Sequence, residues 1–93
     1  MMRSLTGIQP SGTPHIGNYL GAIKPALAVQ SEHETFYFIA TYHALTTARE
    51  PELLRQRTLD VAMTWMACGL DPQQTTLWNQ QAVPEVCELS WIL

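Results

Sequence analysis

Basic side chains are scarce in this chain of 93 residues. Five Lys and Arg stand against eight Asp and Glu, and the formal net charge is −3. Residues 1–49 carry three basic and two acidic side chains, whereas residues 50–93 carry two basic and six acidic ones. Neither half therefore holds the cluster of positive charge with which proteins bind a nucleic-acid backbone.

Long apolar segments are also missing. No stretch approaches the roughly 20 apolar residues of a membrane span, and the first residues form no apolar leader. The two cysteines, Cys68 and Cys87, lack the Cys-x-x-Cys spacing of a redox or zinc motif. We therefore expect a cytoplasmic protein whose cysteines are buried thiols, with no membrane partner and no protein-bound metal.

The composition that remains is that of a small globular domain, since 46% of the residues are hydrophobic and 14% are charged. Runs rich in β-formers alternate with segments whose apolar residues recur every three or four positions. This order predicts an α/β fold of about three parallel strands with crossover helices: strands at residues 4–8, 36–40 and 75–79, and helices from Ile16, Pro51 and Pro84.

Single residues refine this prediction. Pro25 is expected to kink the first helix or to end it early, because proline lacks the backbone N–H and crowds the preceding turn. Gly69, followed by an apolar residue, is typical of a left-handed cap at the end of the second helix. The unbroken apolar run at 36–40 predicts a strand that is covered on both faces. The tryptophans are expected in the core: Trp65, Trp78 and Trp91.

The segment from Gly7 to Asn18 combines a strand exit, a Gly- and Pro-rich loop and a helix start. The first N–H groups of a helix lack internal partners and its dipole favours negative charge, so phosphate is the natural ligand there. His15 and Asn18 lie three residues apart on one side of the first turn, where both can hydrogen-bond one oxyanion. The alternative is that these two side chains only cap the helix.

This segment also carries a family resemblance. The sequences Gly-Ile-Gln-Pro-Ser-Gly at 7–12 and His-Ile-Gly-Asn at 15–18 resemble the His-Ile-Gly-His signature region of class I aminoacyl-tRNA synthetases. With Tyr-His-Ala-Leu-Thr at 42–46, the chain is similar to the tryptophan branch of that family over residues 5–93. The resemblance implies a Rossmann-like nucleotide-binding fold, incomplete here. It also implies that Mg²⁺-ATP activates tryptophan to tryptophanyl-adenylate, which is then transferred to tRNA(Trp).

Site residues follow from the resemblance. It implies His15 and Asn18 as catalytic groups, Asn18 being a neutral hydrogen-bond donor in place of the second histidine. The ATP-binding residues are expected to be Gln9, Pro10, Ser11, Gly17 and Asn18, and the tryptophan pocket is expected to be bracketed by Leu5, Gly7, Ala40 and His43. Thr41 stands where the family usually has Asp, so we leave it out of the predicted site.

The second signature of the family, Lys-Met-Ser-Lys-Ser, does not occur in the sequence, whose single lysine is Lys24. We therefore expect residues 1–93 to be the amino-terminal part of a catalytic domain, cut inside a helix at Leu93 and weak or inactive by itself. Most tRNA contacts and a homodimer interface are expected elsewhere in the full-length protein. Three alternatives stay open: a tyrosyl-tRNA synthetase, a small nucleotidylyltransferase and a truncated, non-catalytic nucleotide-binding paralogue.

Overall fold

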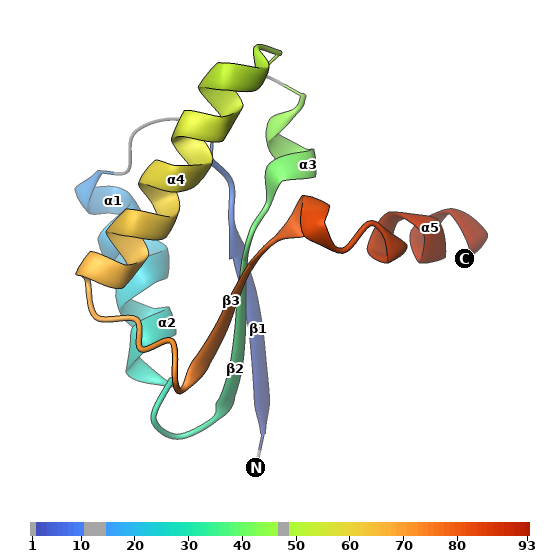
Figure 1. Cartoon of the computed structure of the whole chain (residues 1–93). Coiled ribbons are helices and arrows are strands. Elements are labelled where there is room, and N and C mark those ends of the chain that lie inside the picture. Colours follow the sequence, from blue (N-terminus) through green and yellow to red (C-terminus); the bar gives the residue numbers. More distant parts are fainter. Residues whose placement is uncertain (1, 11–14, 47–48) are drawn as a thin grey trace.

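The computed structural model describes residues 2–10, 15–46 and 49–93. Its centre is a parallel sheet in the order β1-β2-β3. The pairing places Gly7 opposite Phe38 and Tyr37 opposite Leu77. Helices connect the strands, so the predicted α/β arrangement is confirmed (Figure 1). The strands are β1 (Arg3–Ile8), β2 (Glu34–Ile39) and β3 (Thr75–Asn79).

The connection from β1 to β2 is one helical run of changing register. It begins as α1 (Ile16–Asn18), continues as the π-helical η1 (Tyr19–Ile23) and ends as α2 (Lys24–Ala28). The helix does not stop early at Pro25. Lys24 donates its N–H to the carbonyl of Tyr19, five residues back, and Pro25 becomes the second residue of the new register. At that position a helix does not need the missing N–H.

The connection from β2 to β3 holds two helices, α3 (Thr41–Ala44) and α4 (Pro51–Ala67). The end of α4 is a Schellman motif, as the glycine predicted: Gly69 has φ 118° and donates to the carbonyl of Met66, and Leu70 donates to that of Trp65. Leu70 is 5% exposed. Positive φ is open to glycine without strain, so Gly69 turns the chain from α4 back into the core.

The core lies between the sheet and the helices on one of its faces, with α1, α2 and α4 side by side in Figure 1. Its largest side chains are Trp65 and Tyr37, whose rings stack with centroids 5.4 Å apart. The prediction that Trp65 is a core residue is confirmed. Tyr37 donates its hydroxyl to the carbonyl of Ala26, and burial raises the pKa of that hydroxyl above its usual value of 10.0, partly offset by a hydrogen bond with Ser4.

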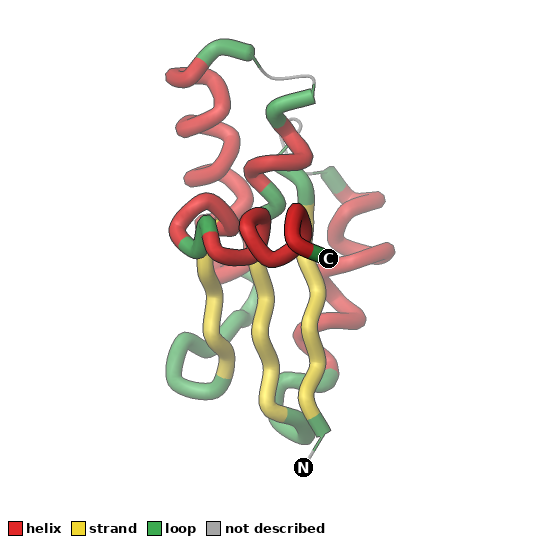
Figure 2. The backbone as a smooth tube through the Cα atoms, turned by 90° about the vertical axis from the view of Figure 1, so that its right-hand side faces the viewer, coloured by secondary structure: helices red, strands yellow, loops and turns green. Residues whose placement is uncertain are grey.

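The opposite face of the sheet is open, so the prediction of a doubly covered β2 is wrong for this chain. Along β2 the buried residues alternate with half-exposed Phe36 and Phe38, because helices of the described residues pack on one face only (Figure 2). Leu5 of β1, on the same face, is 66% exposed. Trp78 is half-buried against Phe38, with ring centroids 5.3 Å apart.

The last helix, α5 (Glu85–Ile92), follows the 3-10 turn η2 (Gln80–Ala82) and projects away from the sheet (Figure 1). Its predicted position in the sequence is confirmed, but two predictions about its side chains are wrong. Trp91 is 91% exposed and is not a core residue, and Cys87 is exposed and is not a buried thiol. Both results have one cause: α5 contains no buried residue, because it does not pack on the core.

Candidate nucleotide and amino-acid site

The carboxyl ends of the three strands meet at one edge of the sheet, and the elements that follow them gather there. The start of α1, the whole of α3 and the first turns of α4 lie at this edge (Figure 1). Ligands of open α/β sheets bind at the carboxyl edge, because helix starts and strand exits present unpaired backbone groups to it. Apart from Leu5, the predicted site residues that the structure describes lie at the end of a strand, within two residues after it, or in α1, its N-cap or α3.

A reciprocal capping box forms the start of α1. His15 is the N-cap, and its Nδ1 accepts a hydrogen bond from the N–H of Gly17 at 3.0 Å. In return the Oδ1 of Asn18 accepts from the N–H of His15 at 2.9 Å. The helix cap expected as the alternative for these two residues is therefore present. It does not consume the groups that a ligand would use.

The cap decides which atoms the two side chains offer. Since Nδ1 of His15 is an acceptor, its ring proton is on Nε2, which is a donor. Since Oδ1 of Asn18 is an acceptor, its carboxamide NH₂ supplies the remaining donors. No acidic residue occurs in the first turn of α1. This helix start therefore presents donors and the positive end of a dipole, which together suit an anionic ligand.

The glycine of the signature has a packing role here. A Cβ on Gly17 would lie 2.8 Å from Cε1 of His15, so the histidine ring occupies the space that the missing side chain leaves. The close approach at Gly17 is thus made by the His15 ring. Ligand contact by Gly17 stays a prediction.

The loop residues differ in what they can offer. Gln9 is half-buried, whereas Pro10 is below 2% exposed. Ser11 lies outside the described residues, as do the next three positions of the loop. ATP contact by these residues stays a prediction.

The structure brings only part of the predicted tryptophan pocket together. Leu5 and Gly7 lie on the open face of β1, and the ring of Phe38 covers Gly7 so closely that a Cβ there would meet it at 2.5 Å. Ala40 follows β2, and His43 is an exposed residue of α3. Leu5 and Gly7 therefore lie on an open surface, without an opposing wall from the described residues.

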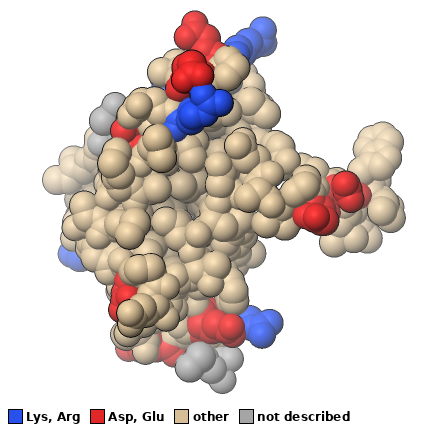
Figure 3. Space-filling view, viewed as in Figure 1, with Lys and Arg blue, Asp and Glu red and all other residues tan. Residues whose placement is uncertain are grey.

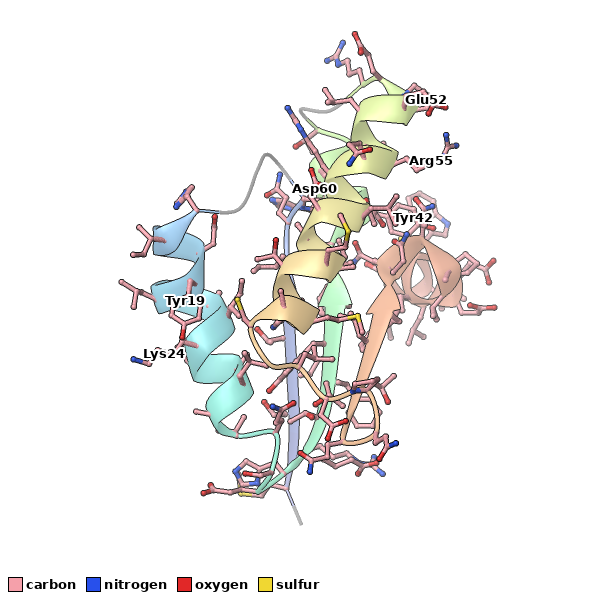
Figure 4. All side chains as sticks on the ribbon, turned by 60° about the vertical axis from the view of Figure 1, so that its left-hand side comes forward. Tyr19, Lys24, Tyr42, Glu52, Arg55 and Asp60 are labelled. Carbon is pink, nitrogen blue, oxygen red and sulfur yellow. The ribbon has the colours of Figure 1, made fainter. Side chains whose placement is uncertain are left out.

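A polar bridge at the same edge was not found from the sequence. The hydroxyl of Thr41 donates to Oδ1 of Asn79 at 2.8 Å, and the N–H of Gln81 donates to the Thr41 hydroxyl at 3.2 Å. The N–H of Tyr42 donates to Oε1 of Gln80 at 3.1 Å. Figure 4 shows Tyr42 beside the segment that follows β3. These residues are distant in sequence, so no local spacing predicts the contact.

The surroundings of the site carry few charges. On the face shown in Figure 3, charged side chains gather near the start of α4, at the opposite end of the sheet and on α5, and leave the middle uncharged. A hollow of about 260 Å³ lies between the first half of α4 and residues Asn79 and Gln81, but none of the predicted site residues lines it. Within residues 2–10, 15–46 and 49–93, no group of three His, Cys, Asp or Glu side chains could hold a metal ion.

Comparison with known proteins decides the family. The model of the family described as tRNA synthetases class I (W and Y) matches residues 1–93. The chain belongs to this class I tRNA synthetase family. W and Y are the one-letter codes of tryptophan and tyrosine, and the family uses ATP. Among the helices that the structure describes, none has both the length and the hydropathy needed to cross a membrane.

The similar relatives within the class I family are tryptophan–tRNA ligases. The chain is 53% identical over 92 residues to the tryptophan–tRNA ligase of Rhodopirellula baltica, covering 99% of this chain and 29% of the relative. It is 52% identical over 93 residues to that of Neisseria meningitidis, with 98% and 28% covered. The chain thus spans less than a third of the length of these relatives.

Solved structures of the class I family agree. The tryptophanyl-tRNA synthetase of Campylobacter jejuni, solved with ADP and tryptophan, superposes with a TM-score of 0.90 at 49% identity, covering 98% of this chain and 28% of that one. The enzyme of Mycoplasma pneumoniae gives a TM-score of 0.92 at 38% identity, with 99% and 27% covered. The chain therefore has the Rossmann-like fold of the amino-terminal region of these synthetases.

Proposed function

We propose that residues 1–93 form the amino-terminal part of the catalytic domain of a tryptophan–tRNA ligase. The observation that carries the proposal is the donor-presenting cap of His15 and Asn18 at the carboxyl edge of a parallel sheet. The named relatives, all matched over nearly the whole of this chain, support the same activity. The proposed reaction is the ATP-dependent formation of tryptophanyl-adenylate, followed by transfer to tRNA(Trp).

In the first step the tryptophan carboxylate would attack the α-phosphorus of ATP and release pyrophosphate. No covalent bond to the protein is needed, so the protein contributes positioning and stabilisation of charge on the phosphoryl oxygens. We assign this role to Nε2–H of His15 and the carboxamide NH₂ of Asn18, which the cap leaves free. Gln9, Pro10, Ser11 and Gly17 are the proposed further ATP contacts.

Magnesium belongs to this proposal as part of the substrate. Mg²⁺ keeps several waters and binds mainly through substrate phosphates, so it needs few protein ligands. The helix start offers hydrogen-bond donors and not carboxylates, which fits a phosphate chain that brings its own cation. When bound, the ion would neutralise part of the charge that His15 and Asn18 stabilise.

The tryptophan side of the proposed site consists of Leu5, Gly7, Ala40 and His43. Leu5 and Gly7 are apolar and lie on the open face near the exit of β1, where a flat ring could rest. Residues outside this chain would supply the opposing wall. This arrangement is supported by the 28% share of the Campylobacter jejuni synthetase that the chain covers.

Partners of the complete protein follow from the same argument. We propose that tRNA(Trp) is bound mainly by regions outside residues 1–93, because this chain is acidic overall. We further propose a cytoplasmic homodimer. The apolar side chains that α5 exposes, Leu89 and Trp91 among them, are available for contacts beyond this chain.

The test is tryptophan-dependent exchange between pyrophosphate and ATP, measured on the complete protein that includes these residues. We expect exchange with tryptophan and little with tyrosine. Preference for tyrosine would support the tyrosine branch of the family. Exchange without any amino acid, or adenylyl transfer to a phosphorylated substrate, would favour a nucleotidylyltransferase; ATP binding without exchange would favour a non-catalytic paralogue.

A further inference from the structure

Two helices follow β2. α4 is 17 residues long, whereas α3 is a single turn. α3 contains only four residues, Thr41–Ala44, and its N-cap residue, Ala40, makes no side-chain capping bond. A helix of one turn is unstable alone, because nucleation orders several residues for a single hydrogen bond. The position of α3 must therefore be determined by its neighbours.

Those neighbours come from the end of β3. Thr41, the first residue of α3, is 1% exposed, and its hydroxyl donates to Asn79 at 2.8 Å. The N–H of Gln81 donates to both the Thr41 hydroxyl and Oδ1 of Asn79, at 3.2 Å each. The next N–H of α3, on Tyr42, donates to Oε1 of Gln80. The polar side chains at the end of β3 thus substitute for a local helix cap.

We propose that Thr41 and Asn79 are positioning residues for the amino-acid side of the site. The proposal rests on the proposed function, because it needs His43 and Ala40 to border the amino-acid pocket. Thr41 does not touch the substrate: its single hydrogen is donated to Asn79, it accepts from Gln81, and it is buried. It acts by fixing the start of the short helix that carries His43.

This bridge also explains how a threonine can stand at position 41. Asn79 accepts from the hydroxyl through Oδ1, and the same oxygen accepts from the N–H of Gln81. A carboxylate at position 41 would lose the donated proton and place its charge against that oxygen. The Thr41 hydroxyl and the Asn79 carboxamide thus form a neutral donor–acceptor pair. A substitution at one of the two positions should therefore need a compensating substitution at the other.

The experiment compares the two ends of β2 in the complete protein. T41V removes the hydroxyl at nearly constant shape, and T41S keeps it. T35V is the matched control, because Thr35 is equally buried at the other end of β2 and its hydroxyl pairs with that of Thr75 at 2.7 Å. KM values for tryptophan and ATP, kcat and thermal stability are measured for each variant.

We expect T41V to raise the KM for tryptophan about tenfold and to change that for ATP less than about twofold. T41S should restore the KM for tryptophan to within about twofold of the original, and T35V should lower stability with both KM values unchanged. An unchanged KM for tryptophan in T41V, or equal effects of T41V and T35V, would overturn the proposal. Absence of tryptophan-dependent exchange in the unmodified protein would instead refute the proposed function.

A second variant covers the case in which T41V does not fold. Gln80→Ala removes only the acceptor for the N–H of Tyr42 and leaves the buried bridge intact. It should raise the KM for tryptophan in the same direction, by a smaller factor of about threefold. A folded Gln80→Ala protein with an unchanged KM for tryptophan would overturn the proposal by itself.

Discussion

The two ends of the same three strands use polar side chains in different ways. At the amino ends, Gln30 donates to the carbonyl of Gly69 at 2.9 Å and accepts from the N–H of Asp71 at 3.0 Å and the hydroxyl of Thr75 at 3.2 Å. Thr75 in turn pairs with Thr35. These bonds link the segment before β2 to the segment before β3, and every polar group of the Gln30 side chain is used within the chain.

At the carboxyl ends, polar side chains also bond to the chain but leave other atoms available. His15 and Asn18 each use one acceptor in the cap, and their remaining polar atoms are donors. His43, on α3, is also exposed. The cluster at the amino ends uses its polar atoms in bonds within the chain, whereas the capping box of α1 leaves donors over, which the proposed function assigns to ATP.

The largest test of this comparison is Asn18→Asp. Aspartate keeps the oxygen that caps His15 and suits the positive end of a helix, so stability should be retained. It loses the NH₂ donors and adds a charge that repels phosphate. We expect the rate of adenylate formation in the complete protein to fall about 100-fold, equivalent to about 2.7 kcal/mol.

Asn18→Ala is the matched variant for that test, because it removes the Asn18 half of the capping box together with the donors. It should lose the rate by a similar factor and also lose about 1 kcal/mol of stability. Rates would be measured by pyrophosphate exchange and stability by thermal unfolding. If Asn18→Asp reacted at the original rate, Asn18 would be a helix cap and nothing more.

At the closed end, Gln30→Ala should reduce the free energy of unfolding by about 2 kcal/mol, because three backbone or hydroxyl groups lose their partner. The KM values for ATP and tryptophan should not change. Urea unfolding followed by tryptophan fluorescence measures the loss. The control is Gln73→Ala, at an exposed glutamine in the turn between α4 and β3. Equal stability of the two variants would mean that the cluster of Gln30 contributes nothing.

Gly7→Ala is a smaller test, on the open face near the exit of β1. The new Cβ would lie 2.5 Å from the ring of Phe38, which must move, at a cost of about 1.5 kcal/mol. Gly21→Ala is the control, since a Cβ there meets nothing within 4 Å and should stabilise the helix by up to about 1 kcal/mol. Thermal unfolding of both variants should therefore shift in opposite directions.

The smallest effect is expected midway between the two ends, at Tyr37. Burial raises the pKa of its hydroxyl, so the folded state favours the neutral phenol. The resulting stability is complete below pH 10 and is lost as the pH rises through the folded pKa. Tyr37→Phe should cost about 1 kcal/mol at neutral pH through the lost bond to Ala26 and should weaken the alkaline fall. Unfolding curves between neutral and alkaline pH measure both effects; an identical alkaline fall in the variant would assign it to other groups.

Local sequence signals predicted the elements well because each element depends on neighbouring residues. The strand at Thr75–Asn79 and the helix from Pro51 were predicted from β-formers, spacing and a proline at the helix start. The Schellman end at Gly69 was predicted because only glycine adopts positive φ without strain. The signature around His15 predicted the position of the helix start. The helix cap, which was the alternative for His15 and Asn18, is present, and ATP contact stays a prediction.

Contacts between distant residues could not be predicted in this way. Trp65 and Trp91 have similar apolar neighbours in sequence, yet one is 1% and the other 91% exposed, because α4 packs on the sheet and α5 does not. Of the kink or early end predicted at Pro25, the early end did not occur, because the helix continues through a wider π turn. The bonds of Gln30 and Thr41 join residues 38 to 45 positions apart.

The sequence by itself determined the order of strands and helices, the caps at His15 and Gly69, and the family signature, since each of these depends on a few adjacent residues. Only the tertiary structure decided which face of the sheet is covered and which polar residues tie the strand ends together. The physical reason is that these features depend on groups brought within about 3 Å of each other by packing, and hydrogen bonds act only at that range.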